Sequence, residues 1–258
     1  MRFRLTLHTH KGSLLPFNYQ YPVSAAIYRI IERADEAFAA FLHNSGYGEG
    51  HRKFKLFTFS DIRTPFARKG DRMQLLTGEA ELMVCFYLPV AAENFIRGLF
   101  LHQQVEIAGR NSKTVFHITQ AESLPDNING RTTLVLQPLS ALVVGRKNSR
   151  GHYDYRSPED DDFTGCLYHN WKEKCTAVGL PVTTGDEAPE AGISVSLFPH
   201  PPQQRLMTIK SGTEAETRIR GYTKFRLRVS APVEMLEVAL GAGLGLYNAQ
   251  GMGCMAIV

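Results

Sequence analysis

Three side chains in the first quarter of the chain have types that suit proton transfer around a developing negative charge. His43 follows Leu42, Tyr28 precedes His43 by fifteen residues, and Lys55 opens the stretch Lys-Leu-Phe-Thr-Phe-Ser. An imidazole can give or take a proton near neutral pH. Lysine and tyrosine can donate hydrogen bonds to an anionic transition state or position the reacting oxygens. The three residues are therefore a candidate acid–base site.

The spacing of these residues sets a condition on the helix that carries them. Residues 25–42 place apolar side chains at helical intervals, so one helix is predicted there. Fifteen residues are about four helical turns but also about 22 Å of straight helix. Tyr28 and His43 can act together only if the helix ends or bends before His43. The plain alternative is that His43 is an ordinary residue at a helix C-terminus.

A second candidate site is the glycine-rich stretch near the C-terminus. Gly243 and Gly245 form one Gly-x-Gly pair, and Gly251 and Gly253 form a second. Five residues, 246–250, separate the two pairs. Glycine at such positions indicates positive φ or close backbone approach. A loop of this kind can expose amide groups to an anion. The plain alternative is a tight connection between a helix at 231–240 and a final strand at 254–258.

The order of the expected elements indicates the fold. The first half reads strand, helix, strand, strand, helix, strand, and the second half repeats this order. The turn-rich residues 124–130 separate the halves. The sequence therefore predicts an α+β protein of two tandem ferredoxin-like (RRM-like) domains, 1–124 and 131–258, the second carrying the C-terminal Gly-rich loop. The expected strands are 2–9, 54–59, 80–88, 105–108, 115–122, 132–137, 141–144, 193–198, 205–210, 217–229 and 254–258, and the other expected helices are 89–101, 158–178 and 231–240.

These motifs resemble those of a known family. The two Gly-x-Gly pairs, together with Tyr28, the Leu-His context of His43 and the Lys-Leu-Phe-Thr-Phe-Ser context of Lys55, look like the CRISPR-associated endoribonucleases that process precursor CRISPR RNA. The resemblance covers almost the whole chain. It implies tandem ferredoxin-like domains and a catalytic set of His43, Tyr28 and Lys55. The segment between His43 and Lys55 is longer than the family pattern and adds His51, which is a rival catalytic histidine.

The resemblance also implies a reaction and a partner. The protein would cleave CRISPR repeat RNA without a metal or cofactor, by attack of a ribose 2′-OH, leaving a 2′,3′-cyclic phosphate and a 5′-OH. Other CRISPR effector subunits are further candidate partners, and the expected state is a monomer or homodimer. The alternative is a non-cleaving RNA-binding subunit of a CRISPR effector complex. A small-molecule enzyme that uses the glycine loop for phosphate ranks last, because no cofactor motif accompanies it.

Positive charge is concentrated although the net charge is only +4. Residues 205–228 hold seven Lys or Arg against two Glu, and residues 52–72 hold seven against two Asp. Within an expected single strand, alternate positions would share one face and bind RNA phosphates. A solvated strand face is the plain alternative. The basic residues in this set are Arg218, Arg220, Lys224, Arg226 and Arg228. Together with the glycines Gly243, Gly245, Gly251 and Gly253, they are the expected RNA-binding residues.

Several classes of protein are disfavoured by composition. The four cysteines are widely separated and form no Cys-x-x-Cys, so neither a disulfide framework nor a zinc site is indicated. The N-terminal residues alternate polar and apolar side chains, unlike a secretory signal. No apolar run reaches transmembrane length. We therefore expect a cytoplasmic protein with no membrane partner.

Overall fold

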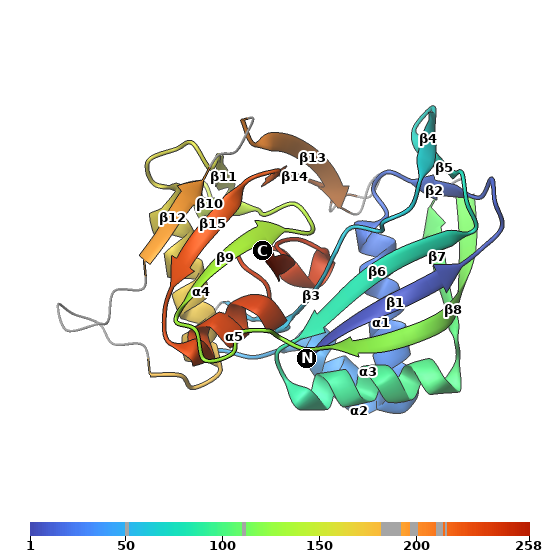
Figure 1. Cartoon of the computed structure of the whole chain (residues 1–258), viewed down its shortest axis with the longest axis horizontal. Helices are drawn as coiled ribbons and strands as arrows, with labels where there is room; N and C mark the ends of the chain where they lie inside the picture. Colours follow the sequence, from blue (N-terminus) through green and yellow to red (C-terminus); the bar gives the residue numbers. More distant parts are fainter. Residues whose placement is uncertain (50–51, 110–111, 182–191, 197–200, 210–213, 215) are drawn as a thin grey trace.

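The computed structural model describes residues 1–49, 52–109, 112–181, 192–196, 201–209, 214 and 216–258. Two antiparallel sheets lie side by side in Figure 1, each with helices on one face. In the first half the elements are β1 (Arg2–His8), β2 (Leu14–Pro16), α1 (Gln20–Ala34), α2 (Glu36–Asn44), β3 (Phe57–Phe59), β4 (Phe66–Lys69), β5 (Arg72–Leu75), β6 (Glu79–Phe86), α3 (Pro89–Leu101), β7 (Gln104–Gly109) and β8 (Ser112–Leu124). In the second half they are β9 (Thr133–Pro138), β10 (Val144–Lys147), β11 (Tyr153–Arg156), α4 (Phe163–Ala177), β12 (Gly192–Ser196), β13 (Gln203–Ile209), β14 (Thr217–Thr223), β15 (Arg226–Ser230), α5 (Val233–Gly241), the 3-10 helix η1 (Asn248–Gln250) and β16 (Met255–Ile257).

The strand orders confirm the predicted fold class. The first sheet has the order β3-β6-β1-β8-β7, and the second has β12-β15-β9-β16. In both, the first strand of the unit lies in the interior between the third and the last, which is the ferredoxin-like arrangement. β7 is added at the edge of the first sheet. The protein is thus α+β, with two sheet-rich, tandem ferredoxin-like domains.

Each sheet buries an apolar face against its own helices. In β1 the alternating residues Phe3, Leu5 and Leu7 are buried with Ile27 and Ile30 of α1. This period-two pattern in the strand meets a helical stripe, as expected for an amphipathic helix on a sheet. In the second domain Trp171 of α4 is fully buried, and its indole N–H donates to the Met235 carbonyl of α5 at 2.9 Å. The opposite face of β1 carries Arg2, Arg4 and Thr6, and the opposite face of β15 carries the exposed Arg226 and Arg228.

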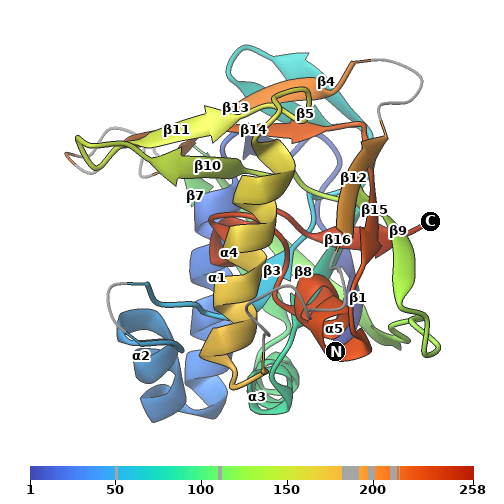
Figure 2. The same ribbon diagram turned by 90° about the vertical axis from the view of Figure 1, so that its left-hand side faces the viewer.

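The predicted single helix at 25–42 is wrong. α1 begins earlier, at Gln20, and ends at Ala34, and Asp35 is extended (φ −158°, ψ 98°) before α2 starts at Glu36. The Asp35 carboxylate accepts a hydrogen bond from the Phe38 N–H at 2.8 Å, so it is an N-cap for α2. The chain therefore turns, and Figure 2 shows α2 lying alongside α1. Helical periodicity continues through Asp35, which is why the break was missed.

The predicted strand at 217–229 is also wrong. Lys224 lies between β14 and β15 with φ 61°, a left-handed conformation that ends the first strand. β14 pairs with β13 as a hairpin and makes an isolated bridge through Tyr222 to Leu142, whereas β15 is an interior strand of the second sheet. The expected strand at 54–59 shrinks to β3 because Leu56 has φ 55°. Residues 146–156 form most of the β10–β11 hairpin.

Candidate active site

The break at Asp35 brings Tyr28 and His43 together. Their ring centroids are 5.3 Å apart and the rings are nearly perpendicular, at 81°. Tyr28 packs on its other side against Phe57 of β3, at 5.5 Å. The His43 side chain is exposed, so a substrate can reach it. The condition set by the fifteen-residue spacing is met because the helix ends before His43.

Lys55 joins the same group from the segment that enters β3. Its Nζ donates a hydrogen bond to the His43 carbonyl at 2.7 Å. Partial burial lowers the pKa of Lys55, and the neighbouring charge of Lys53 lowers it further. Burial raises the pKa of the Tyr28 phenol, so the phenol stays protonated at neutral pH and is a donor. We refer to Tyr28, His43 and Lys55, the three residues expected to be catalytic, as the catalytic trio. His51 lies outside the described residues.

The glycine-rich loop is folded inward rather than laid open. All four glycines have positive φ, between 65° and 80°, and all four are buried. A Cβ on Gly253 would lie 1.9 Å from the Leu244 carbonyl oxygen, and one on Gly251 would lie 2.3 Å from the Phe59 ring. The glycines are therefore required by conformation and close packing. The half-exposed part of the loop is Tyr247, Asn248, Ala249 and Gln250.

The loop is held against the first domain by two hydroxyl groups. Ser24 of α1 donates to the Ala249 carbonyl at 2.6 Å, and Thr58 of β3 donates to the Met252 carbonyl at 2.9 Å. Ser24 lies inside α1, and its side chain reaches the loop. Because these contacts come from the same helix and strand as Tyr28 and Phe57, the loop lies beside the catalytic trio.

A buried lysine holds the loop from the second domain. Lys174 of α4 is 2% exposed, and its Nζ donates to the carbonyl oxygens of Gly243 (2.7 Å) and Gly245 (2.8 Å) and to Asn248 Oδ1 (2.5 Å). Burial lowers its pKa to about 7. Three acceptors match the three N–H bonds of an ammonium group. Sequence reasoning missed Lys174, because a lone lysine within a helix gives no signal of burial.

The five basic residues predicted to bind RNA do not form one stripe. Arg218 and Arg220 project from β14 in the β13–β14 hairpin, whereas Arg226 and Arg228 project from β15. Lys224 lies at the junction. All five side chains are exposed. The pair on β15 lies on the sheet face opposite the buried Leu227 and Val229, which is the open face of the second domain.

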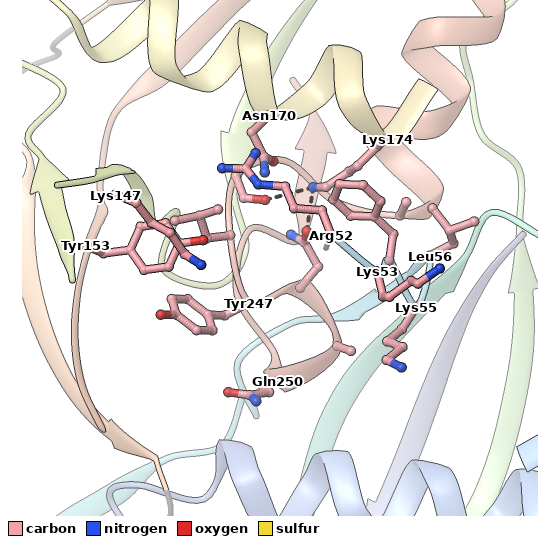
Figure 3. A pocket seen from close by; sticks show the side chains of 16 residues that line it. Arg52, Lys53, Lys55, Leu56, Lys147, Tyr153, Asn170, Lys174, Tyr247 and Gln250 are labelled. Atoms are coloured by element: carbon pink, nitrogen blue, oxygen red, sulfur yellow. Dashed lines mark hydrogen bonds between the residues drawn. The ribbon is translucent and has the colours of Figure 1, made fainter. Parts of the chain in front are cut away.

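A cavity of about 340 Å³ adjoins the trio and the loop. Its lining comes from residues 52–56, the β10–β11 hairpin, α4 and the glycine-rich loop, so both domains contribute (Figure 3). Lys55 belongs to this lining as well as to the trio. The sequence did mark Arg52 and Lys53 as basic, but it did not bring them to Lys147, Tyr153 or Asn170, since only tertiary structure does so.

In the part of the chain that is described, no three His, Cys, Asp or Glu side chains gather closely enough to hold a metal ion. The four cysteines are free, and Cys85 and Cys254 lie with their sulfur atoms 3.9 Å apart.

Among the described residues, no helix is both long enough and apolar enough to cross a membrane.

The chain is similar to known proteins along its whole length. The family described as "CRISPR-associated protein Cas6, N-terminal" matches residues 14–119, and "CRISPR associated protein Cas6, C-terminal" matches residues 124–257. A protein named CRISPR-associated endoribonuclease Cas6 1, from Methanocaldococcus jannaschii, is 33% identical over 69% of this chain and 66% of its own length. CRISPR-associated endoribonuclease Cas6 from Pyrococcus furiosus is 22% identical over 100% of this chain and 90% of its own.

Solved structures show the same fold. The structure of a Cas6-related protein from Pyrococcus furiosus aligns with a TM-score of 0.80 and 17% identity, covering 100% of this chain and 98% of that one. Likeness at this identity concerns the fold alone. Family membership rests on the two Cas6 sequence families, whose matches together cover nearly all of the chain. The chain belongs to the CRISPR-associated Cas6 family.

Proposed function

We propose that this Cas6-family chain is an endoribonuclease that cleaves precursor CRISPR RNA within its repeats. The observation that carries the proposal is the convergence of Tyr28, His43 and Lys55 from α1, α2 and the segment before β3. Relatives that match this chain are named endoribonucleases. A binding protein would not need an exposed imidazole beside a lysine and a phenol, so this arrangement favours cleavage over the non-cleaving alternative.

The trio is suited to metal-independent transesterification. The ribose 2′-oxygen attacks the adjacent phosphorus, the bond from phosphorus to the 5′-oxygen breaks, and the products are a 2′,3′-cyclic phosphate and a 5′-OH. One proton leaves the 2′-OH and one reaches the 5′-oxygen. His43 is the proton-transfer group. The Lys55 ammonium and the Tyr28 phenol donate to the phosphate oxygens, where negative charge grows.

Binding of the RNA rests on charge and on the shape of the glycine-rich loop. Exposed arginines on β14 and β15, with Lys224 between the two strands, offer phosphate contacts. These contacts would extend the RNA-binding surface beyond the trio. Gly243, Gly245, Gly251 and Gly253 contribute through conformation, because they are buried and shape the half-exposed residues 247–250. We further propose the domain boundaries 1–124 and 131–258, and action in the cytoplasm, where transcripts of repeat arrays would be found.

The proposal is tested by incubating the full chain with a repeat RNA in EDTA. We expect cleavage at one position, with a cyclic phosphate on the upstream product. A substrate with a 2′-deoxy sugar at that position should bind and remain intact, because it lacks the nucleophile. Loss of cleavage in EDTA that Mg²⁺ restores would overturn the mechanism, and tight binding without cleavage under any condition would favour the non-cleaving subunit.

A further inference from the structure

One wall of the cavity beside the catalytic trio is aromatic. Tyr247 and Tyr153 meet with ring centroids 6.0 Å apart at 67°, and the hydroxyls of Tyr247 and Tyr155 are 3.4 Å apart. Both Tyr247 and Tyr153 line the cavity and are half-buried, so part of each ring faces open space (Figure 3). Unpaired bases stack on aromatic side chains of this kind.

The backbone of Tyr247 carries strain. Its φ of 59° and ψ of 31° lie in the left-handed region, which is unfavourable for a residue with a side chain because the Cβ crowds the following carbonyl oxygen. The neighbouring loop positions that adopt positive φ, Gly245 and Gly251, are glycines. A glycine at 247 would relieve the strain, yet a tyrosine is present. Strained residues concentrate at ligand sites, so the conformation itself points to a use for this ring.

Positive charge surrounds the opposite side of the cavity. Lys53 and Lys55 line it from the segment before β3, and Arg52 lines it while paired with Glu173 of α4. Figure 3 shows Lys53 and Lys55 across the cavity from Tyr153 and Tyr247, with the Arg52 guanidinium beside Asn170. Lys147 also lines the cavity and lies over the Tyr153 ring, with its Nζ 5.8 Å from the ring centroid. The cavity therefore offers cations for a phosphate group together with an aromatic wall for a base.

Two amide side chains of the lining lack partners. Asn170 of α4 is 5% exposed, and neither its Oδ1 nor Gln250 Oε1 has a hydrogen-bond partner within the described part of the chain. Both residues line the cavity. A buried polar atom left without a partner is costly and rare in folded proteins. Asn and Gln carry both donor and acceptor groups, which match the edges of nucleic-acid bases.

We propose that this cavity binds one unpaired nucleotide of the repeat RNA, adjacent to the scissile phosphate. The base stacks against Tyr247 and Tyr153, with its edge toward Asn170 and Gln250, and the phosphate lies toward Lys53 and Lys55. The nucleotide is adjacent to the cut because Lys55 belongs both to the cavity and to the catalytic trio. This inference rests on the proposed function and names a specificity site for it.

The test uses the full chain and a repeat RNA made uncleavable by a 2′-deoxy sugar at the cut. 2-Aminopurine is placed in turn at the two nucleotides on each side of the cut, and its fluorescence is read on binding. Wild type should quench one of these positions by stacking. Tyr247→Leu, which keeps apolar volume but no ring, should lose the quenching. Tyr247→Phe, which keeps the ring, should retain it.

A binding cycle gives the second readout. Removing the base at the quenched position should weaken wild-type and Tyr247→Phe binding by roughly 5- to 150-fold, the range for one stacked base, and should weaken Tyr247→Leu binding far less. Thermal unfolding checks whether Tyr247→Leu is folded. If it is not, Tyr153→Leu and Tyr153→Phe provide the same comparison. An equal penalty in Leu and Phe variants, or no quenching at any position, overturns the proposal. Because the RNA is uncleavable, stacking can be observed even if the protein proves unable to cleave, so failure of the function and failure of this site are distinguished.

Discussion

At the level of single residues, the proposed mechanism assigns proton transfer and charge stabilisation to different members of the trio. His43 is exposed and lies edge-on to Tyr28, while Lys55 is bound to the backbone of His43 and not to its ring. The imidazole is thus positioned by packing and by α2, and its Nδ1 lies 3.0 Å from the Asn44 side-chain oxygen. Removing one member of the trio should then alter one step of the reaction and leave the others in place.

His43→Ala should remove most cleavage and leave affinity for repeat RNA nearly unchanged. A positioned proton-transfer group typically contributes about 10²–10⁴-fold in rate, whereas binding is distributed over many phosphate contacts. Single-turnover rates and filter-binding affinities measure the two effects. His51→Ala is the matched control, since His51 is the rival histidine. An inactive His51→Ala with an active His43→Ala would transfer the catalytic assignment to His51.

Lys55→Arg should change the alkaline limb of the pH–rate profile. Burial lowers the pKa of Lys55 from its ordinary 10.5. Its ammonium is needed in the charged form, so the cleavage rate should fall as pH rises through this lowered pKa. Arginine remains protonated throughout, so the limb should move to higher pH in the variant even if the maximal rate drops. The profile of kcat/KM reports the free enzyme, and identical alkaline limbs in both proteins would remove Lys55 from the mechanism.

At the level of elements, the glycine-rich loop is a structural connector whose partly exposed middle, residues 247–250, lines the cavity. It is held by α1, β3 and α4 through Ser24, Thr58 and Lys174. The glycines make these approaches possible, and the residues between the two pairs face the cavity. Loss of a glycine should therefore act first on folding, and on RNA only through the displaced segment 247–250.

Gly253→Ala should destabilise the protein strongly. The added Cβ would lie 1.9 Å from the Leu244 carbonyl oxygen, and the residue must also keep φ 65°. The left-handed conformation alone costs about 1–3 kcal/mol, and the clash adds to this. Gly130→Ala is a matched control, because Gly130 has φ 71° with nothing within 4 Å of its Cβ position. Urea unfolding of both variants separates the contribution of packing from that of φ. Equal losses of stability would show that the loop is not tightly packed.

The order of helices and strands and the residues of the trio could be predicted from the sequence. The interruptions of those elements, which bring the trio together, could not. Apolar periodicity and turn residues are local, so they predict two ferredoxin-like units. Asp35 interrupts a helix whose apolar pattern continues, and Lys224 and Leu56 adopt positive φ although neither is a glycine. Tertiary contacts decide these conformations, as they also decide the burial of Lys174. The cavity was beyond prediction because its walls come from segments far apart in the sequence.

At the level of the whole molecule, the two domains are tied together around the glycine-rich loop. Besides the Ser24 and Thr58 contacts, Arg205 of β13 pairs with Asp61 after β3 at 2.5 Å, and Tyr19 donates to the same carboxylate. Arg2 of β1 donates to the Met255 carbonyl of β16 at 3.0 Å. These contacts fix the relative positions of the trio, the cavity and both basic strands, which together form the proposed RNA-binding surface.

The final prediction concerns the path of RNA over that surface. The basic pairs on β14 and β15 lie on different sheets, so a repeat RNA that crosses both should lose contacts independently. Arg218→Gln with Arg220→Gln, and separately Arg226→Gln with Arg228→Gln, should each weaken binding. Each pair should also reduce the slope of log K against log salt by about 1.4, at about 0.7 per phosphate contact with single-stranded nucleic acid.

Filter binding at several salt concentrations measures these slopes. Arg33→Gln with Arg97→Gln is the control pair, because these exposed arginines lie on α1 and α3, in the helical layer of the first domain. The control should keep the wild-type slope. A wild-type slope in the β14 variant alone would confine the RNA to the open face of the second sheet, since the hairpin would then make no phosphate contact. If the β14 and β15 double variants both kept the wild-type slope, neither strand would bind the RNA backbone. The basic residues at 52–55 would then have to supply the charge that holds the RNA.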